Sequence, residues 1–247
     1  MKLNHTNKAY IGISIVLLLL IIYTFTNNRS SDRYNYAASI TVPATFPVHL
    51  KRAYFLMSNG DFEGVRSEEL ENFTADWHSY DVSTNHVENQ LLPEKLVLSY
   101  LSYRNKTFYS DTLTLPVEEM KMVFETAAKN EQFLVLSSYA GIKKGLAYMI
   151  GVANDGNVIM WLRGVNLEKV VFKTKLKAKE PNFDDLNDEK ALTEEEYFNS
   201  VFRDLSDSVK IKLNSGYDSK ANYIDTPSRY IENNKKLWST KNRVHLP

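Results

Sequence analysis

Four side chains that could carry out chemistry lie within one short stretch of the sequence. They are two carboxylates and two imidazoles: Asp76, His78, Asp81 and His86. Side chains of these types bind zinc in hydrolases or act together as a general acid and base. Their spacing fits no established metal-ligand pattern, and a group of polar residues in a loop is usually only a solvated loop. The sequence therefore leaves a metal or catalytic site open as the less favoured interpretation.

The sequence lacks the other motifs that would indicate an enzyme. It contains no phosphate-binding Gly-Lys-Ser loop, no GxGxxG segment after a strand, no GxSxG nucleophile elbow and no HExxH zinc motif. It also has 0 cysteines, which excludes disulfides, thiolate metal sites, a cysteine nucleophile and lipid attachment at a cysteine. We therefore expect no cofactor and assign no catalytic or metal-binding residue from the sequence motifs.

A row of lysines is the second feature that could recognise another molecule. From Phe172 to Lys179 every second residue is a lysine, which is the alternation of a strand with one wet face. This lysine ladder is most simply a solvated sheet edge that resists aggregation, and a basic patch for a partner is the alternative. Aromatic residues of an irregular region are further possible anchors. The candidate partner-binding residues are Trp77, His78, Tyr80, Lys173, Lys175 and Lys177.

Two apolar segments before the ladder predict the centre of the sheet that carries it. Leu146 to Ala153 and Val158 to Arg163 are apolar on both faces, which is typical of strands covered on both sides. Between them, Asn154 to Asn157 contains the Asp-Gly pair of a two-residue type I′ hairpin. We expect a three-stranded meander in which Val158 and Trp161 are buried and define the fold.

Apolar and alternating runs predict further strands. These strands are expected at Tyr34 to Val42, Val48 to Met57, Leu96 to Tyr103, Thr107 to Leu115 and Gln132 to Ala140. The region from Ser58 to Pro93 shows no sustained period, so it predicts a long loop or a set of short irregular pieces.

Helices are expected at three places after residue 115. Apolar residues recur at helical spacing from Pro116 to about Asn130, which predicts one helix. Thr193 to Glu196 has the form of a capping box before a second apolar stripe, which predicts another. A short helix is expected at Tyr230 to Trp238. The predicted fold class is α+β, with a largely antiparallel sheet that is sandwich-like or strongly curved, and with two or three packed helices.

The N-terminus carries an apolar run that suggests a transmembrane helix before this domain. Ala9 to Phe25 contains 17 residues without a charge, close to the roughly 20 that cross a bilayer as a helix. No convincing small-x-small cleavage site follows, so an uncleaved signal anchor is favoured over a cleaved signal peptide. The residues expected in the membrane include Ala9, Tyr10, Ile11, Leu17, Leu20, Tyr23 and Phe25.

Length and charge indicate one ordinary domain after this run. The chain has 247 residues, of which 43% are hydrophobic and 24% charged, so residues 1–28 are expected to form an anchor and residues 29–247 a single extracytoplasmic domain. Lys2 and Lys8 precede the run and favour a cytoplasmic N-terminus. The remainder carries 28 basic against 30 acidic residues, a net charge of about −2. This balance argues against nucleic-acid binding, which usually needs a basic excess.

Three segments occur in an order that resembles the bacterial envelope proteins grouped as domain-of-unknown-function (DUF) family 2931. They are YNYAASITVPATFPVHLKRAYF, LPEKLVLSYLSYRNKTFYSDTLTLPVEEM and AYMIGVANDGNVIMWLRGVNLEKVVFKTKLKAK. The matching positions are Phe108-Tyr109, Leu115-Pro116, Gly156-Asn157-Val158 and Trp161-Leu162, and the resemblance covers roughly Tyr34 to Lys179. The chain departs from many relatives in having no lipobox cysteine, and a transmembrane anchor would serve the same purpose.

The resemblance implies a function in protein binding and no enzymatic activity. Such proteins are often found beside secreted antibacterial effectors, notably type VI phospholipases, which implies a role as their cognate immunity proteins. We therefore expect a single-pass protein of the bacterial inner membrane, with its C-terminal domain in the periplasm and a secreted effector as partner. A structural or accessory envelope protein without a toxin partner is the alternative, and a periplasmic hydrolase that uses the Asp76 to His86 region is the third hypothesis.

Overall fold

The computed structural model describes residues 4–28, 33–67, 70–74, 86–138, 141–181, 193–215 and 220–241. Contacts within the chain divide it into two compact units, Met1–Arg33 and Tyr34–Pro247.

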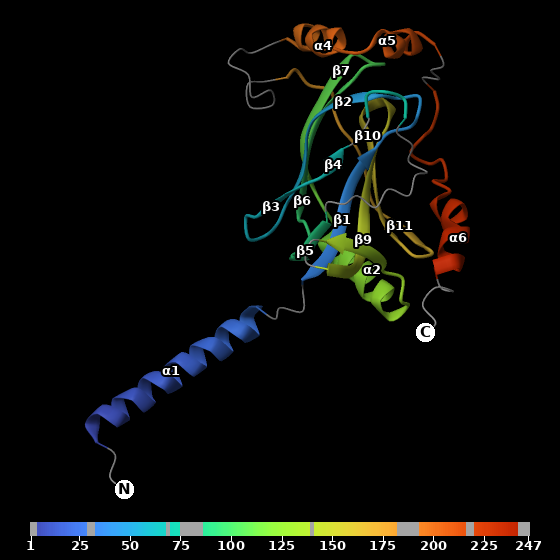
Figure 1. The fold of residues 1–247 in the computed structure, drawn as a ribbon. Coiled ribbons are helices and arrows are strands. Elements are labelled where there is room, and N and C mark those ends of the chain that lie inside the picture. Colours follow the sequence, from blue (N-terminus) through green and yellow to red (C-terminus); the bar gives the residue numbers. More distant parts are fainter. Residues whose placement is uncertain are drawn as a thin grey trace. The chain divides into compact units, whose positions relative to one another are not determined.

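The described residues of the first unit form one helix, α1 (His5–Asn28), of 24 residues (Figure 1). Its large apolar side chains from Tyr10 to Tyr23 are exposed, and because they follow one another without interruption from Ile15 to Tyr23 they cover every side of the helix. Judged on the residues that the structure describes, no helix is both long enough and apolar enough to cross a membrane.

The larger sheet of the second unit has seven strands in its described residues. They are β1 (Tyr34–Thr41), β4 (Arg66–Ser67), β5 (His86–Gln90), β8 (Leu134–Ser138), β9 (Gly141–Val152), β10 (Asn157–Gly164) and β11 (Leu167–Lys175). Five of them follow the order β11-β10-β9-β1-β4, while β5 pairs with β1 and β8 pairs with β9. Strand β1 runs parallel to β9 and β4, and the other neighbours are antiparallel.

The smaller sheet has four antiparallel strands in the order β3-β2-β6-β7. They are β2 (Val48–Leu56), β3 (Phe62–Gly64), β6 (Lys95–Ser102) and β7 (Thr107–Thr114). Strands β6 and β7 form the hairpin that the alternation of the sequence predicts, and Lys106 in its turn has a positive φ of 53°.

The two sheets pack face to face and enclose the main core (Figure 1). Phe55 of the smaller sheet contacts Tyr36 and Tyr148 of the larger one, with ring centroids 6.5 and 5.2 Å apart. All three rings are buried, and tilted aromatic contacts of this kind add to the free energy gained by apolar burial. The sandwich-like arrangement therefore rests on side chains that alternate inward from both sheets.

Strands β9 and β10 are covered on both faces, as their apolar character predicts. Val158 faces the main core and is fully buried, whereas Trp161 lies on the opposite face in a second cluster. Tyr223 and Ile224, from the segment before α6, pack against that cluster. The prediction that Val158 and Trp161 are buried is confirmed.

Four helices belong to the described part of the second unit: α2 (Val117–Lys129), α4 (Glu194–Arg203), α5 (Asp207–Leu213) and α6 (Tyr230–Lys241). Phe124 anchors α2 in the main core, and Tyr197 and Phe198 of α4 pack on the smaller sheet around Phe108. Helix α6 lies beside β11 (Figure 1). The predicted capping box is present, because Thr193 accepts from the backbone of Glu196 and the Glu196 carboxylate accepts from the backbone of Thr193.

The α+β class and the mostly antiparallel sheets are confirmed, but the expected two or three packed helices are too few. The apolar stripe after Thr193 predicts one continuous helix, whereas α4 ends at Arg203 and α5 begins at Asp207. Ser206 adopts an extended backbone between them, with ψ of 150°, so the same stripe is shared by two short helices. The apolar spacing alone cannot show this break, because Leu205 and Val209 are buried on either side of it.

Two local predictions also differ from the structure. The turn between β9 and β10 is a 3₁₀ turn, η1 (Asn154–Gly156), and not a two-residue turn, although Asp155 and Gly156 take the positive φ values, 56° and 77°, that the Asp-Gly pair indicates. The region from Ser58 to Pro93, expected to be irregular, contains β3, β4 and β5. These strands are short, which is why no period is visible in the sequence.

Candidate functional site

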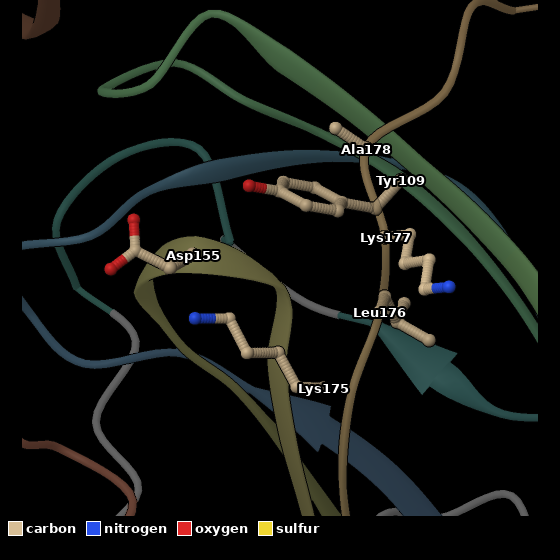
Figure 2. A pocket seen from close by; sticks show the side chains of 6 residues that line it. All are labelled: Tyr109, Asp155, Lys175, Leu176, Lys177 and Ala178. Atoms are coloured by element: carbon tan, nitrogen blue, oxygen red, sulfur yellow. The ribbon is translucent and has the colours of Figure 1, made fainter.

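A surface pocket of about 460 Å³ lies where the chain leaves the larger sheet and joins the smaller one. Six residues line it: Tyr109, Asp155, Lys175, Leu176, Lys177 and Ala178 (Figure 2). They come from β7, from the η1 turn and from the end of β11 with the segment that follows it. The pocket therefore brings together three chain segments that are distant in sequence.

Backbone hydrogen bonds fix the segment after β11 against both neighbours. Leu176 N donates to Gly156 O at 2.8 Å, and Lys179 N donates to Phe108 O at 3.1 Å. Between these bonds, Ala178 pairs with Tyr109 of β7 as an isolated antiparallel bridge. The extended segment thus changes its pairing partner from one sheet to the other, and the pocket forms at this crossover.

Gly156 allows the η1 turn to approach the crossover closely. A Cβ atom at this position would lie 2.4 Å from Leu176 O and 2.8 Å from Tyr109 Cε1, distances at which the backbone would have to move. Its φ of 77° is also one that glycine adopts without strain. A glycine is therefore needed here for both the turn and the wall of the pocket.

Three polar groups of different chemistry point into the pocket. The Lys175 ammonium, the Asp155 carboxylate and the Tyr109 hydroxyl lie on one side of the crossover segment, whereas the Lys177 ammonium points away from them (Figure 2). The Asp155 carboxylate is oriented by Asn105, whose Nδ2 donates to Oδ1 at 3.3 Å. The arrangement offers a positive charge, a negative charge and a hydroxyl to the same space, which is a set of groups that binds and orients a polar ligand.

Burial keeps the tyrosines beside the pocket protonated. Burial raises the pKa of Tyr109, an effect that hydrogen bonding with Asn105 and Thr107 partly offsets. Burial also raises the pKa of Tyr100, whose ring stacks on that of Tyr109 with centroids 5.1 Å apart. Both hydroxyls are therefore neutral at physiological pH, and the Tyr109 hydroxyl is available as a hydrogen-bond donor.

The lysines of the ladder differ in whether they form an ion pair within the chain. Lys173 donates to Asp225 at 2.8 Å, and Asn222 donates to the other oxygen of the same carboxylate at 2.8 Å. Lys175 and Lys177 are exposed and form no ion pair within the described residues. The positive charge of Lys173 is thus already used within the chain, while those of Lys175 and Lys177 remain available.

His49 on β2 and Glu71 in a turn form a second group that could do chemistry. His49 Nδ1 lies 2.5 Å from Glu71 Oε1, and the Tyr103 hydroxyl donates to the same oxygen at 3.2 Å. The His49 ring also meets the edge of Tyr197, with centroids 6.0 Å apart. A carboxylate that orients an imidazole occurs in catalytic pairs. Here the contacts with Tyr103 and Tyr197 also link β2 to the turn after β6 and to α4.

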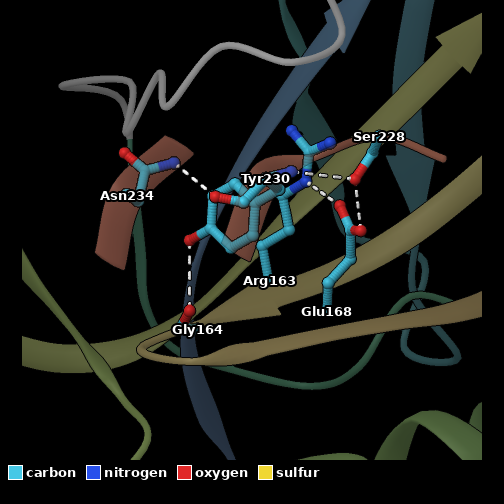
Figure 3. Close-up of polar contacts among 6 residues, drawn as sticks. All are labelled: Arg163, Gly164, Glu168, Ser228, Tyr230 and Asn234. Carbon is cyan, nitrogen blue, oxygen red and sulfur yellow. Dashed lines mark hydrogen bonds and ion pairs between the residues drawn. The ribbon is translucent and has the colours of Figure 1, made fainter. Parts of the chain in front are cut away.

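A buried polar cluster holds the C-terminal segment on the turn between β10 and β11 (Figure 3). Arg163 Nε donates to Glu168 Oε1 at 2.8 Å, and the Ser228 hydroxyl donates to the other oxygen of Glu168. The Tyr230 hydroxyl donates to Gly164 O at 3.1 Å. We name Arg163, Glu168, Ser228 and Tyr230 the C-terminal clasp. Because its groups satisfy one another, the clasp is a structural feature and not a binding site.

Comparison with sequence models of protein families identifies the family of this chain. The sequence model of the family described as "Protein of unknown function (DUF2931)" matches residues 24–225, which is more than half of the chain. The chain belongs to the DUF2931 family. No curated protein and no solved structure matches it.

The DUF2931 match covers a longer part of the chain than the resemblance suggests. It includes the whole pocket and the ion pair of Lys173 with Asp225. Ser228 and Tyr230 of the C-terminal clasp come after its end. The family region therefore provides Arg163 and Glu168, and the segment that completes the clasp lies beyond it.

The structure places only some of the predicted site residues. Outside the described residues lie Asp76, Trp77, His78, Tyr80 and Asp81. His86 belongs to β5, where it pairs with Ala37 of β1. Within the described part of the chain, no group of three or more His, Cys, Asp or Glu side chains could hold a metal ion.

The remaining predictions fall on described elements. The anchor residues Ala9, Tyr10, Ile11, Leu17, Leu20, Tyr23 and Phe25 all belong to α1. Lys175 and Lys177 line the pocket, and Lys173 does not. The sequence interpretation missed Tyr109 and Asp155 as pocket residues. The Asp-Gly turn is the signal that could have suggested Asp155, because a turn between two central strands must lie at the end of the sheet.

Proposed function

We propose that this protein is anchored in the bacterial inner membrane and that its periplasmic domain binds and neutralises a secreted antibacterial effector, a type VI phospholipase, as the cognate immunity protein. The observation that carries the proposal is an exposed apolar helix, α1, in the same chain as a folded domain with exposed, unpaired lysines. The choice of partner is supported by the resemblance of this chain to DUF2931 proteins, which are often found beside such effectors.

No described helix meets the length and hydropathy of a membrane span, so the anchoring part of the proposal rests on the exposed apolar surface of α1 and on the uncharged run of the sequence. Its side chains between Tyr10 and Tyr23 are roughly half exposed or more, for example 64% for Ile21 and 59% for Leu19. They belong to the uncharged run from Ala9 to Phe25. Exposed apolar area is unfavourable in water by roughly 25 cal/mol per Å², so contact with lipid would remove a substantial cost. A position in the membrane would place the domain where a periplasmic phospholipase acts.

Effector binding is inferred from the charge and shape of the crossover. Lys175 at the end of β11 and Lys177 in the segment after it line the pocket, and unpaired lysines attract acidic surfaces and speed association. An interface of about 1,600 Å² would be enough for a specific complex and could cover the active-site cleft of an enzyme. A protein that acts in this way needs no catalytic centre of its own.

Co-expression in bacteria tests the neutralising function. A type VI phospholipase directed to the periplasm should stop growth alone, and the full chain should restore growth and co-purify with the phospholipase. The double variant Lys175→Glu/Lys177→Glu should weaken both effects at least tenfold, because it reverses the charges of the proposed contact. Lys169→Glu is the matched control, since Lys169 is an exposed lysine of the same strand that does not line the pocket.

The outcomes separate this function from the alternative. Absence of both rescue and binding with every phospholipase tried would refute the immunity proposal. A deletion strain with an envelope defect in the absence of any toxin would favour the structural or accessory function.

Thiol labelling tests the topology independently. The chain has 0 cysteines, so one introduced cysteine is the only thiol. A membrane-impermeant maleimide applied to spheroplasts should label Thr112→Cys in the folded domain and not Asn7→Cys before the apolar run; both positions are exposed in the structure. Labelling of Asn7→Cys alone, or of both, would contradict a periplasmic domain with a cytoplasmic N-terminus.

A further inference from the structure

Opposite charges face the same pocket without neutralising each other. Lys175 and Asp155 both line it, yet no ion pair within 4.0 Å joins them. Their side chains point into the space from different segments, Lys175 from the end of β11 and Asp155 from η1 (Figure 2). The gap between the two charges is therefore open to a ligand.

The backbone segments that carry these two charges are joined before any ligand arrives. The bond from Leu176 N to Gly156 O joins the segment of Lys175 to the turn of Asp155, and Asn105 orients the Asp155 carboxylate. The Tyr109 ring stacks on the Tyr100 ring and lies close to Gly156, so its position is also fixed. A preorganised backbone and ring lower the conformational entropy lost on binding, although the Lys175 side chain must still be ordered.

The sign of the charges selects the class of ligand. A simple anion would pair with Lys175 but would be repelled by Asp155, and a simple cation would meet the opposite problem. A zwitterion satisfies both groups at once. A primary ammonium suits Asp155, since its N–H groups can donate to the carboxylate. A phosphate or carboxylate suits Lys175 and the Tyr109 hydroxyl, which are both donors.

We propose that the pocket formed by Tyr109, Asp155 and Lys175 binds a small zwitterion of the phosphoethanolamine type, with its anionic group on Lys175 and Tyr109 and its primary ammonium on Asp155. Such a group exists both as a free molecule and as the headgroup of a phospholipid. The pocket shares Lys175 with the proposed effector contact. The zwitterion binds to this chain alone, so the proposal does not depend on effector binding. Because both charges are exposed to water, the binding is weak, with a dissociation constant on the order of 1 mM.

A nuclear magnetic resonance titration of the full chain in detergent micelles tests this proposal. Phosphoethanolamine should shift the backbone amide signals of residues 155–157 and 175–178 in a saturable way. Inorganic phosphate, ethanolamine and phosphocholine should each bind at least tenfold more weakly, because the first two lack one charge and the third has no ammonium N–H. Sodium chloride at about 1 M should suppress the shifts, since the Debye length is then about 3 Å.

Substitutions locate the binding. Lys175→Gln and Asp155→Asn should each weaken phosphoethanolamine binding at least fivefold, and Tyr109→Phe should weaken it about threefold. Lys169→Gln should leave it unchanged, because Lys169 does not line the pocket. The unshifted signals of the rest of the domain show in the same spectra that each variant is folded.

Three results would overturn the proposal. They are phosphate binding as tightly as phosphoethanolamine, a loss of phosphoethanolamine affinity in Lys169→Gln equal to that in Lys175→Gln, or no saturable shift up to about 50 mM ligand. The source is then distinguished in lipid nanodiscs. The same amide shifts in phosphatidylethanolamine but not in phosphatidylcholine nanodiscs assign a lipid headgroup, and shifts with the soluble molecule alone assign a free zwitterion.

Discussion

Arg163 donates from Nε to Glu168 Oε1 at 2.8 Å while only 1% of its side chain is exposed. Its guanidinium also lies 5.1 Å from the Trp161 ring and 4.6 Å from the Tyr230 ring. We expect Glu168→Gln to lower the free energy of unfolding by about 3 kcal/mol, because it leaves the charge of Arg163 buried without a counter-ion. Urea denaturation of the full chain, followed by tryptophan fluorescence, measures the change.

Two further variants show whether the lost charge is responsible. Arg163→Met keeps the apolar stem without a buried charge and should cost less than Glu168→Gln. Glu195→Gln changes an exposed glutamate of α4 and should stay within about 0.5 kcal/mol of the wild type. If Glu168→Gln were as stable as Glu195→Gln, the ion pair would not hold the C-terminal clasp.

Gly156 is expected to be the least replaceable glycine of the η1 turn and crossover. Gly156→Ala should destabilise the protein by about 3 kcal/mol, because it combines a positive φ with a Cβ 2.4 Å from Leu176 O. Gly60→Ala is the matched control: its φ is 86°, but nothing lies within 4 Å of the added Cβ. It should cost only about 1 kcal/mol. Thermal and urea unfolding measure both, and equal losses would contradict the argument from close packing.

The strands that could be predicted from the sequence are those with a local signal. The Asp-Gly turn locates the β9–β10 hairpin, because neighbouring antiparallel strands need only a short turn. The alternation from Phe172 to Lys179 overlaps β11 (Leu167–Lys175) only as far as Lys175, since the chain then passes to a bridge with β7. The parallel pairing of β1 with β9 could not be predicted in the same way. It joins Tyr36 to Leu146, residues far apart in the chain, and local periodicity contains no information on such a pair.

The candidate site also combines features with a local sequence signal and features that depend on contacts between distant segments. Lys175 and Lys177 are visible as members of an alternating strand, but their separation from Lys173 depends on Asp225, which folds back from a distant segment. The inclusion of Tyr109 depends on its bridge to Ala178 across the crossover. Sequence patterns can therefore identify polar groups on strands, while their convergence on one pocket is decided by tertiary pairing.

Tyr148 offers a test of an unsatisfied buried hydroxyl. It is 1% exposed, and its hydroxyl has no hydrogen-bond partner in the described part of the chain. Tyr148→Phe should be neutral or stabilising by up to about 1 kcal/mol, because a buried hydroxyl without a partner loses its hydrogen bonds to water on folding and gains none in return. Tyr230→Phe should instead cost about 1 kcal/mol, since it loses the bond to Gly164 O. A larger loss for Tyr148→Phe than for Tyr230→Phe would show that the Tyr148 hydroxyl has a partner.

The ion pair between Lys173 and Asp225 predicts a pH dependence at the acidic end. The hydrogen bond from Lys173, together with one from Asn222, lowers the pKa of Asp225 below its ordinary value of about 3.8. A carboxyl whose pKa is lowered by folding stabilises the fold above its unfolded pKa, and this contribution is lost as the pH falls through the folded value. The stability difference between wild type and Asp225→Asn should therefore be constant near pH 7 and shrink as the pH falls below the ordinary aspartate pKa of about 3.8. Carbon-13 titration of the carboxyl should show its pKa rising in Lys173→Gln; an unchanged pKa would mean that Lys173 does not hold Asp225 in solution.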